Sequence, residues 1–312
     1  MAQIEIPDSV VVSMQSLIAL RLQAGKSIGS TRKKSTAQRS GNFASPFRGR
    51  GMDFSEVRLY QPGDDIRSID WRVTARTGKT HTKLYTEERE RAIYFVVDTG
   101  PSMQFGTQVS FKSVVASKVA GLLAWSSMSH GDRVGGIFFS GNKHKEIKPV
   151  GGKRGVLTFL KNMVDWSHDS FSKNDESTGS GFVDVVSRLK RVAKPGSLIF
   201  IISDFNVISE SARLYLRQIS QHCDLALINV YDELEKNAPP AGNYMLSDGS
   251  HSGKFVANGK STHDTILSDF IATEDKLKQF CLKSGIHFFS ICSTDDLSRH
   301  ITLNMHRRAG GK

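Results

Sequence analysis

Cysteine is scarce in this chain of 312 residues, and its scarcity excludes two classes of protein. The three cysteines, Cys223, Cys281 and Cys292, lie far apart, are odd in number and show no C-x-x-C spacing. This pattern provides neither the disulfide framework of a small secreted domain nor the paired thiolates of a zinc site. We therefore expect three reduced thiols in a reducing compartment.

Long hydrophobic runs are also missing. The most apolar segment, residues 197–202, is far shorter than the roughly 18 residues that a membrane-spanning helix requires. The first residues carry Glu5 and Asp8, whereas a secretory signal peptide begins with basic residues. The sequence predicts no membrane span and no secretion signal, and we expect a cytoplasmic location.

The motifs of the common enzyme classes are absent as well. The chain has no GxxxxGK[ST] phosphate loop, no GxGxxG, no HExxH and no GxSxG. Residues 98–100 read Asp-Thr-Gly, which matches the active-site tripeptide of aspartic proteases. That chemistry needs two such carboxylates, and the chain holds no second Asp-Thr-Gly or Asp-Ser-Gly. We therefore predict that the protein is not an enzyme.

Acidic residues are missing from residues 21–50, whereas the whole chain has a net charge of +11. Clustered cations gain free energy by neutralising a polyanion, so this basic arm could bind nucleic acid or an anionic surface. The alternative is a solvated linker, which we favour because no aromatic side chain precedes Phe43 to stack on bases. The basic residues of the arm are Arg21, Lys26, Arg32, Lys33, Lys34, Arg39, Arg48 and Arg50.

The sequence does contain a regular succession of strands and helices. A helix is expected over residues 7–24, capped by Asp8 or Ser9. Between residues 49 and 90 we predict a small unit with strands at 54–60 and 80–87 and a helical turn at 69–75. This unit is too small to be stable alone, and we expect it to pack against the rest of the chain.

From residue 91 onward, apolar strands alternate with amphipathic helices, which indicates a mostly parallel, doubly wound α/β sheet covered on both faces. We divide the chain into an N-terminal helix and basic linker (1–48), the small β-containing unit (49–90) and the α/β domain (91–312). The expected strands are 92–98, 134–139, 197–203, 225–230 and 286–291, and the expected helices are 111–130, 156–164, 182–192, 211–220 and 264–283.

Oxygen-bearing side chains follow two of the predicted strands. Asp98 and Asp204 each end an apolar strand, and ligands of a parallel sheet bind outside the carboxyl ends of its strands. Ser102 lies in the loop after Asp98, and Thr178 and Ser180 lie in a polar loop before a predicted helix. Carboxylate and hydroxyl oxygens are ligands that Mg²⁺ prefers, so a magnesium site is expected here.

These residues resemble the metal-ion-dependent adhesion site of von Willebrand factor A domains, whose first loop reads Asp-x-Ser-x-Ser. The resemblance implies that Asp98, Ser102 and Asp204 are metal ligands, with either Thr178 or Ser180 as the ligand of the second loop. Gly100 stands where the pattern has its middle serine, so a water would have to replace one hydroxyl ligand. The alternative is that Asp98 and Ser102 only cap the following helix.

A second stretch, residues 58–78, reads RLYQPGDDIRSIDWRVTARTG and resembles a family of uncharacterised bacterial proteins with a von Willebrand factor A-like domain. Members are usually encoded beside MoxR-type AAA+ ATPases. The resemblance implies a non-enzymatic adaptor or co-chaperone that helps such an ATPase act on client proteins, with other A-domain proteins as further partners. The residues that carry the likeness are Arg58, Tyr60, Asp64, Asp65, Arg67, Asp70, Trp71 and Arg76.

The charged residues of this stretch have two interpretations. Arginines that alternate with aspartates can form ion pairs that fasten a small unit, with Trp71 as its apolar anchor. Tryptophan and arginine are also favoured at protein interfaces, so partner binding remains open. We favour the structural interpretation over a catalytic one, because neither a nucleophile nor a histidine lies among the charges.

Overall fold

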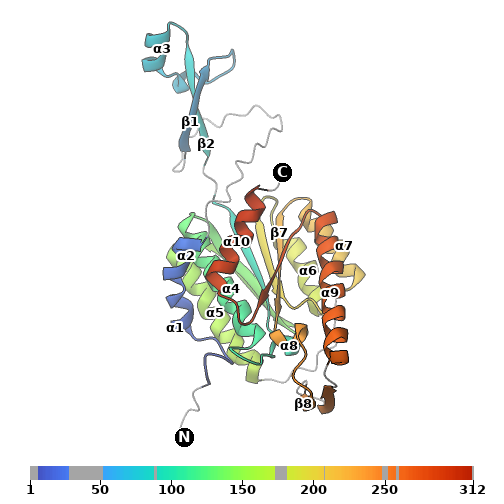
Figure 1. Cartoon of the computed structure of the whole chain (residues 1–312). Helices are drawn as coiled ribbons and strands as arrows, with labels where there is room; N and C mark the ends of the chain where they lie inside the picture. Colours follow the sequence, from blue (N-terminus) through green and yellow to red (C-terminus); the bar gives the residue numbers. More distant parts are fainter. Residues whose placement is uncertain are drawn as a thin grey trace. The chain divides into compact units, whose positions relative to one another are not determined.

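The computed structural model describes residues 6–27, 52–87, 90–172, 181–206, 208–247, 252–257 and 260–310. The chain forms two compact units (Figure 1). The small unit is Arg32–Glu90, and the larger α/β body combines Met1–Thr31 with Arg91–Lys312. The body is therefore discontinuous in sequence. None of the described helices offers an apolar stretch of bilayer-spanning length.

The small unit is an antiparallel ribbon that carries two short helices. Strands β1 (Met52–Leu59) and β2 (His81–Glu87) pair along their length, close to the predicted positions. The connection holds a 3-10 turn, η1 (Ile66–Ser68), and helix α3 (Trp71–Thr77). The Asp70 carboxylate accepts hydrogen bonds from the second and third amides of α3, which fixes where the helix begins.

The α/β body is built on a six-stranded sheet in the order β10-β7-β6-β3-β4-β5. All neighbouring strands run parallel except β4 and β5, which are antiparallel. The predicted mostly parallel, doubly wound sheet is confirmed. The strands are β3 (Ala92–Asp98), β4 (Arg133–Ser140), β5 (Lys143–Gly151), β6 (Leu198–Ser203), β7 (Asp224–Tyr231) and β10 (His287–Cys292).

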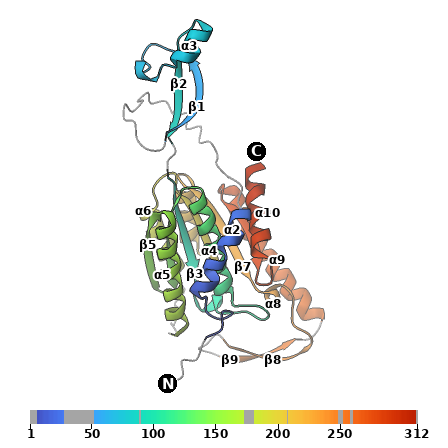
Figure 2. The same cartoon turned by 90° about the vertical axis from the view of Figure 1, so that its left-hand side faces the viewer.

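Helices cover both faces of this sheet, and alternate residues of β3 show how the two cores divide. Phe95 packs into the core formed with α1, α4, α5 and α10, whereas Val96 packs into the core formed with α6, α7 and α9. Figure 2 shows α1, α2 and α4 side by side over the first face. The helices are α1 (Met14–Ala19), α2 (Arg21–Ser27), α4 (Lys112–Ser129), α5 (Gly152–Ser172), α6 (Gly181–Val192), α7 (Glu210–Ser220), α8 (Glu233–Lys236), α9 (Lys260–Lys283) and α10 (Leu297–Gly310), with a 3-10 turn η2 (Pro101–Met103).

The N-terminal helix begins later than predicted. Ser13, not Asp8 or Ser9, caps α1, because its hydroxyl accepts a hydrogen bond from the Ser16 amide at 3.2 Å. The Asp8 carboxylate instead accepts a hydrogen bond from the Ser13 hydroxyl at 3.0 Å. Asp8 therefore supports the cap rather than supplying it.

Several elements were not predicted. Strand β5 is a half-exposed edge strand rich in lysine, and such a polar sequence lacks the apolar run of a buried strand. The short helix α8, the last helix α10 and an antiparallel hairpin also appear. The hairpin consists of β8 (Gly242–Ser247) and β9 (Ser252–Ala257).

Candidate recognition site

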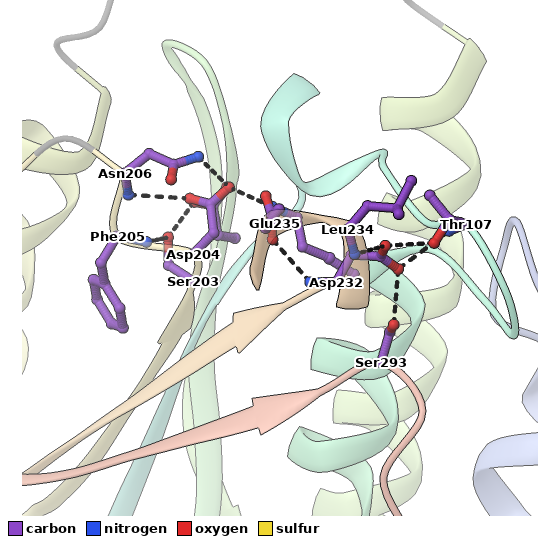
Figure 3. Close-up of polar contacts among 11 residues, drawn as sticks. Thr107, Ser203, Asp204, Phe205, Asn206, Asp232, Leu234, Glu235 and Ser293 are labelled. Atoms are coloured by element: carbon purple, nitrogen blue, oxygen red, sulfur yellow. Dashed lines mark hydrogen bonds and ion pairs between the residues drawn. The ribbon is translucent and has the colours of Figure 1, made fainter. Parts of the chain in front are cut away.

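Polar side chains gather at the carboxyl edge of the parallel sheet, as expected for this architecture. Val97 aligns with Ile202 across β3 and β6, so Asp98 and Ser203 come next at the same level. Asp204 and Asp232 follow the ends of β6 and β7. Figure 3 shows Asp204 and Asp232 just after the ends of neighbouring strands. We use the name acidic crevice for one group of side chains, namely Asp98, Lys112, Asp204, Asp232 and Glu235.

Asp98 is a buried carboxylate, with 9% of its surface exposed. Its Oδ1 accepts a hydrogen bond from the Gly100 amide at 2.8 Å, and its Oδ2 accepts one from the Ser203 hydroxyl at 2.6 Å. Burial, followed by the negative charge of Asp204, raises the pKa of Asp98 to about 7, although these hydrogen bonds and the charge of Lys112 oppose the rise. Asp98 is thus partly protonated near neutral pH.

Lys112 is a fully buried lysine at the start of α4. Its ammonium Nζ lies 3.0 Å from Oδ2 of Asp204 and 2.5 Å from Oε1 of Glu235. Burial alone would lower the pKa of Lys112, but the charges of Asp204 and Glu235 outweigh it, so the pKa is raised. Lys112 therefore stays charged and joins α4 to the loop after β6 and to α8.

The sequence analysis missed Lys112, although one signal was present. A lysine in the first turn of a helix faces the positive end of the helix dipole, where a cation is disfavoured. Such a residue needs a compensating acid, and here the acids come from positions 204 and 235. The unfavourable position could have marked Lys112 as a candidate.

Asp232 is a second fully buried carboxylate of the crevice. It accepts hydrogen bonds from the Thr107 amide at 3.1 Å, the Thr107 hydroxyl at 2.5 Å, the Ser293 hydroxyl at 2.8 Å and the Leu234 amide at 3.1 Å. Burial opposes ionisation, but these hydrogen bonds outweigh it, and the pKa of Asp232 is lowered. The sequence analysis missed Asp232, although it ends an apolar strand just as Asp98 does.

Glu235 connects the two halves of the crevice. Its Oε2 accepts a hydrogen bond from the Asp232 amide at 2.8 Å, which completes the capping box of α8. Its Oε1 accepts from the Lys112 ammonium. Figure 3 shows Glu235 between Asp204 and Asp232. One side chain therefore fixes α8 relative to both Lys112 and the Asp232 hydrogen bonds.

The expected metal ligands are only partly brought together. Asp98 and Asp204 meet in the crevice, and the charge of Asp204 acts on Asp98. Ser102 lies in η2 and is exposed, whereas Thr178 and Ser180 lie outside the described residues. A Cβ atom at Gly100 would lie 3.1 Å from Oδ1 of Asp98, so a serine there would crowd the carboxylate.

The crevice as described does not fit a divalent ion. One oxygen of Asp204 is taken by the Lys112 ammonium, and both oxygens of Asp98 accept hydrogen bonds from groups of the chain. In the described part of the chain, no three His, Cys, Asp or Glu side chains form a group that could hold a metal. Binding of Mg²⁺ stays a prediction, and the cation that the structure places beside Asp204 is the Lys112 ammonium.

The aspartates of the small unit fix its local structure. Arg58 Nη2 lies 2.6 Å from Oδ1 of Asp64, and the Tyr60 hydroxyl donates to the Asp64 carbonyl at 3.3 Å. Asp65 caps η1 through the Arg67 amide at 2.9 Å. Asp70, besides capping α3, lies 3.6 Å from the ammonium of Lys83. The contacts are mostly caps rather than the alternating arginine pairs that we expected.

Trp71 is not the buried anchor that the sequence suggested, since 67% of its surface is exposed. Ile66 is 66% exposed in the same segment. Arg67, Arg72 and Arg76 are exposed too, and within the described residues no ion pair joins them to an acid. The physical reason lies in the small unit itself. Trp71 is the first residue of a two-turn helix on a two-stranded ribbon, and a two-stranded ribbon has no hydrophobic core in which the side chain could be buried.

The basic arm falls almost entirely outside the described residues, which end at residue 27 and resume at 52. Of its cations, Arg21 and Lys26 lie in α2, and the Arg21 guanidinium lies over the ring of Trp125 at 5.7 Å. Arg21 thus packs on α4 in the α/β body. For the residues of the arm that the structure does not describe, the solvated linker and the polyanion-binding arm both stay predictions.

Comparison with known proteins identifies one family. The family model described as "Protein of unknown function DUF58" matches residues 56–276. Uncharacterized proteins of Mycobacterium bovis and Mycobacterium tuberculosis are 28% identical over 200 residues, which is 64% of this chain and 61% of theirs. The match thus spans less than two thirds of the length of these relatives. The predicted likeness to a family of uncharacterised bacterial proteins is confirmed.

Solved structures give distant likenesses. A conserved hypothetical protein BatB from Bacteroides thetaiotaomicron covers 71% of this chain and 100% of its own, at 12% identity and a TM-score of 0.43. An aerotolerance-related membrane protein from Bacteroides fragilis covers 70% and 99%, at 12% identity and 0.42. A von Willebrand factor type A protein from Catenulispora acidiphila covers 72% and 45%, at 9% identity and 0.33.

Proposed function

The chain belongs to the DUF58 family of proteins of unknown function, and we propose that it is a non-enzymatic protein–protein interaction module. Within that role, we propose an adaptor or co-chaperone that brings client proteins to a MoxR-type AAA+ ATPase. The likeness of residues 58–78 to proteins encoded beside such ATPases supports this partner. The client and its pathway follow from neither the sequence nor the fold.

The observation that carries the proposal is the exposure of Trp71. Large aromatic side chains are costly to leave in water, and tryptophan and arginine supply most of the binding energy at many interfaces. The segment 66–76 presents Ile66, Trp71 and three arginines without a described ion pair. We define it as the Trp71 segment and assign it the contact with the ATPase.

No catalytic role is proposed for the acidic crevice. Both oxygens of Asp98 accept hydrogen bonds from the chain itself, and Asp232 accepts four. A general base or nucleophile must lie within reach of its substrate, whereas Asp98 is 9% exposed and Asp232 is fully buried. The crevice supports a structural or recognition role.

Replacement of Trp71 by alanine is expected to weaken capture of the MoxR-type ATPase by about tenfold or more, as truncation of a central interface tryptophan does. The melting temperature should stay within about 1 °C of the wild type, because an exposed side chain contributes little to stability. Binding is measured by titrating the purified ATPase, and Leu282→Ala, whose residue is 81% exposed in α9, is the matched control.

The opposite pattern would contradict this assignment. If Trp71→Ala binds the ATPase as the wild type does but melts several degrees lower, the tryptophan packs within the chain and the ATPase binds elsewhere. If Leu282→Ala weakens binding as much as Trp71→Ala, the loss is not specific to the Trp71 segment.

Charge reversal in the basic arm tests the alternative function. We expect the triple variant with Arg32, Lys33 and Lys34 each changed to Glu to capture the ATPase as the wild type does, and neither protein to bind DNA or RNA specifically. A salt-dependent association that the triple variant loses by more than about tenfold would favour nucleic-acid binding instead. Reversal of three exposed cations of α5, Lys153, Arg154 and Lys161, controls for net charge.

A further inference from the structure

We infer that Lys112 is the built-in cation of the acidic crevice, so that the crevice holds its carboxylates together without a divalent metal. A divalent cation binds there only when this ammonium is removed. The inference goes beyond the proposed function and does not rest on it, because the ATPase contact is assigned to the Trp71 segment and not to this crevice. Its physical basis is the set of contacts around Nζ.

The ammonium of Lys112 occupies the position where carboxylates from two loops converge. It lies 3.0 Å from Asp204 on the loop after β6 and 2.5 Å from Glu235 on α8. The Lys112 side chain is 1% exposed and that of Asp204 is 6% exposed, so water screens this contact poorly. The ammonium therefore supplies the positive charge that these two acids face.

The charge balance also requires a cation at this place. Asp98, Asp204 and Glu235 act on one another or on Lys112 through their charges. Asp98 and Asp204 have buried side chains and repel each other, whereas the Glu235 side chain is 29% exposed. A cation beside such carboxylates relieves the repulsion. In A-type adhesion sites a divalent ion has this role, whereas here the chain supplies a single charge of its own.

The first helical turn is an unfavourable place for a lysine, because the helix dipole presents positive charge there. The helix propensity of lysine therefore does not explain why a fully buried lysine lies at this position. The nearby Gly100 removes a hydroxyl that a metal would use, and a side chain there would crowd Asp98. Both features favour the ammonium over the metal, and they arise from separate positions in the sequence.

A metal and the ammonium cannot share the Asp204 carboxylate without repulsion. Mg²⁺ binds carboxylate oxygens at about 2.0–2.1 Å and demands octahedral geometry. An ammonium 3.0 Å from Oδ2 of the same carboxylate would lie within a few ångströms of that ion. Removing the lysine charge therefore should free the oxygens of Asp204 and Glu235 for a divalent cation, with water as its other ligands.

The test is metal binding to the isolated full chain. The partner is omitted because an AAA+ ATPase uses Mg²⁺ itself. Thermal unfolding is followed in EDTA and in 5 mM Mg²⁺ for the wild type and Lys112→Met, and binding of Mn²⁺ is measured by calorimetry. Lys118→Met, which removes another lysine of α4, is the matched control.

The wild type and Lys118→Met should show no saturable Mn²⁺ binding and a Mg²⁺-dependent shift below about 1 °C. Lys112→Met should melt lower in EDTA, because its acids lose their counter-charge, and should regain several degrees in Mg²⁺ through ligand-linked stabilisation. Saturable Mn²⁺ binding by Lys112→Met, abolished by adding Asp204→Asn, would place the ion in the crevice.

Two results would overturn the inference. One is saturable Mn²⁺ binding by the wild type that Asp204→Asn abolishes, since the metal then coexists with the lysine. The other is a folded Lys112→Met that binds no metal, since the ammonium then is not what excludes it. If Lys112→Met does not fold, Lys112→Gln replaces it, and if that fails too the wild-type titration alone decides. Loss of ATPase capture in Trp71→Ala is a separate result, so failure of the adaptor role and failure of the lysine role are distinguishable.

Discussion

An Asp232→Ala variant is expected to lose about 4 kcal/mol or more of its free energy of unfolding, because four buried donors lose their acceptor and each costs about 1 to 3 kcal/mol. The donors are the Thr107 amide and hydroxyl, the Ser293 hydroxyl and the Leu234 amide. They belong to three separate segments, so no single neighbour can replace the lost acceptor. The measurement is urea unfolding at pH 7.

Two further variants sharpen this prediction. Asp232→Asn keeps the volume and one acceptor oxygen, and we expect it to lose roughly half as much stability. Glu210→Ala removes an acid whose side chain is 83% exposed and should change stability by less than about 0.5 kcal/mol. An Asp232→Ala loss as small as that of Glu210→Ala would mean that water satisfies these donors and that Asp232 does not hold the crevice together.

Asp98→Asn should have the opposite effect and stabilise the protein at neutral and alkaline pH. Burial raises the pKa of Asp98 from its ordinary 3.8 to about 7 in the folded chain, so ionising it there opposes folding. One pKa unit corresponds to about 1.4 kcal/mol, which sets an upper limit of about 4 kcal/mol for the gain. An asparagine can accept from the Gly100 amide and donate to the Ser203 oxygen, so both hydrogen bonds have a counterpart.

The pH dependence of this gain has a definite sign. Below about pH 4 the carboxyl is protonated in both folded and unfolded chains, and the variant should have no advantage. Between about pH 4 and pH 7 the unfolded chain releases the proton while the folded chain keeps it, so the wild type loses stability as the pH rises. Above pH 7 the difference should be constant. Unfolding in EDTA at pH 4, 6 and 8 measures it.

Asp204→Asn is the contrasting control, because it removes the charge that faces the Lys112 ammonium. We expect it to be less stable than the wild type at pH 8, where Asp98→Asn is more stable. An Asp98→Asn variant that is destabilised at every pH would contradict the raised pKa and would indicate that the ionised carboxylate is the stable form.

The sheet could be predicted from the sequence because its central strands are continuous apolar runs. Strands β3 and β6 appear at almost the predicted residues, since a strand buried on both faces leaves an unbroken hydrophobic signal. Strand β5 and helix α10 leave weaker signals, because an edge strand is half exposed and, among the described side chains of α10, Ile301 and Met305 are the buried ones. Local hydrophobic patterns in the sequence indicate which elements are buried. Elements that bury few side chains leave no such pattern and are not predicted.

The candidate site was predictable to the extent that its residues lie at strand ends. Asp98 and Asp204 were found by that rule, and Asp232 obeys it as well but was not chosen. The sequence could not show that Lys112 belongs to the site, because its partners Asp204 and Glu235 lie 92 and 123 residues away in the chain. The exposure of Trp71 was equally hidden, since composition does not reveal whether a ribbon has a core to cover its tryptophan.

The discontinuous α/β body has a consequence for the order of assembly during synthesis. Helices α1 and α2 leave the ribosome before the small unit, yet α2 packs against α4 and against α10 near the other end of the chain. A nascent chain therefore cannot complete the body until α10 has emerged, whereas the paired strands β1 and β2 of the small unit emerge long before it. For the time in between, the apolar side of α1 and α2 is a surface on which a nascent-chain chaperone can act.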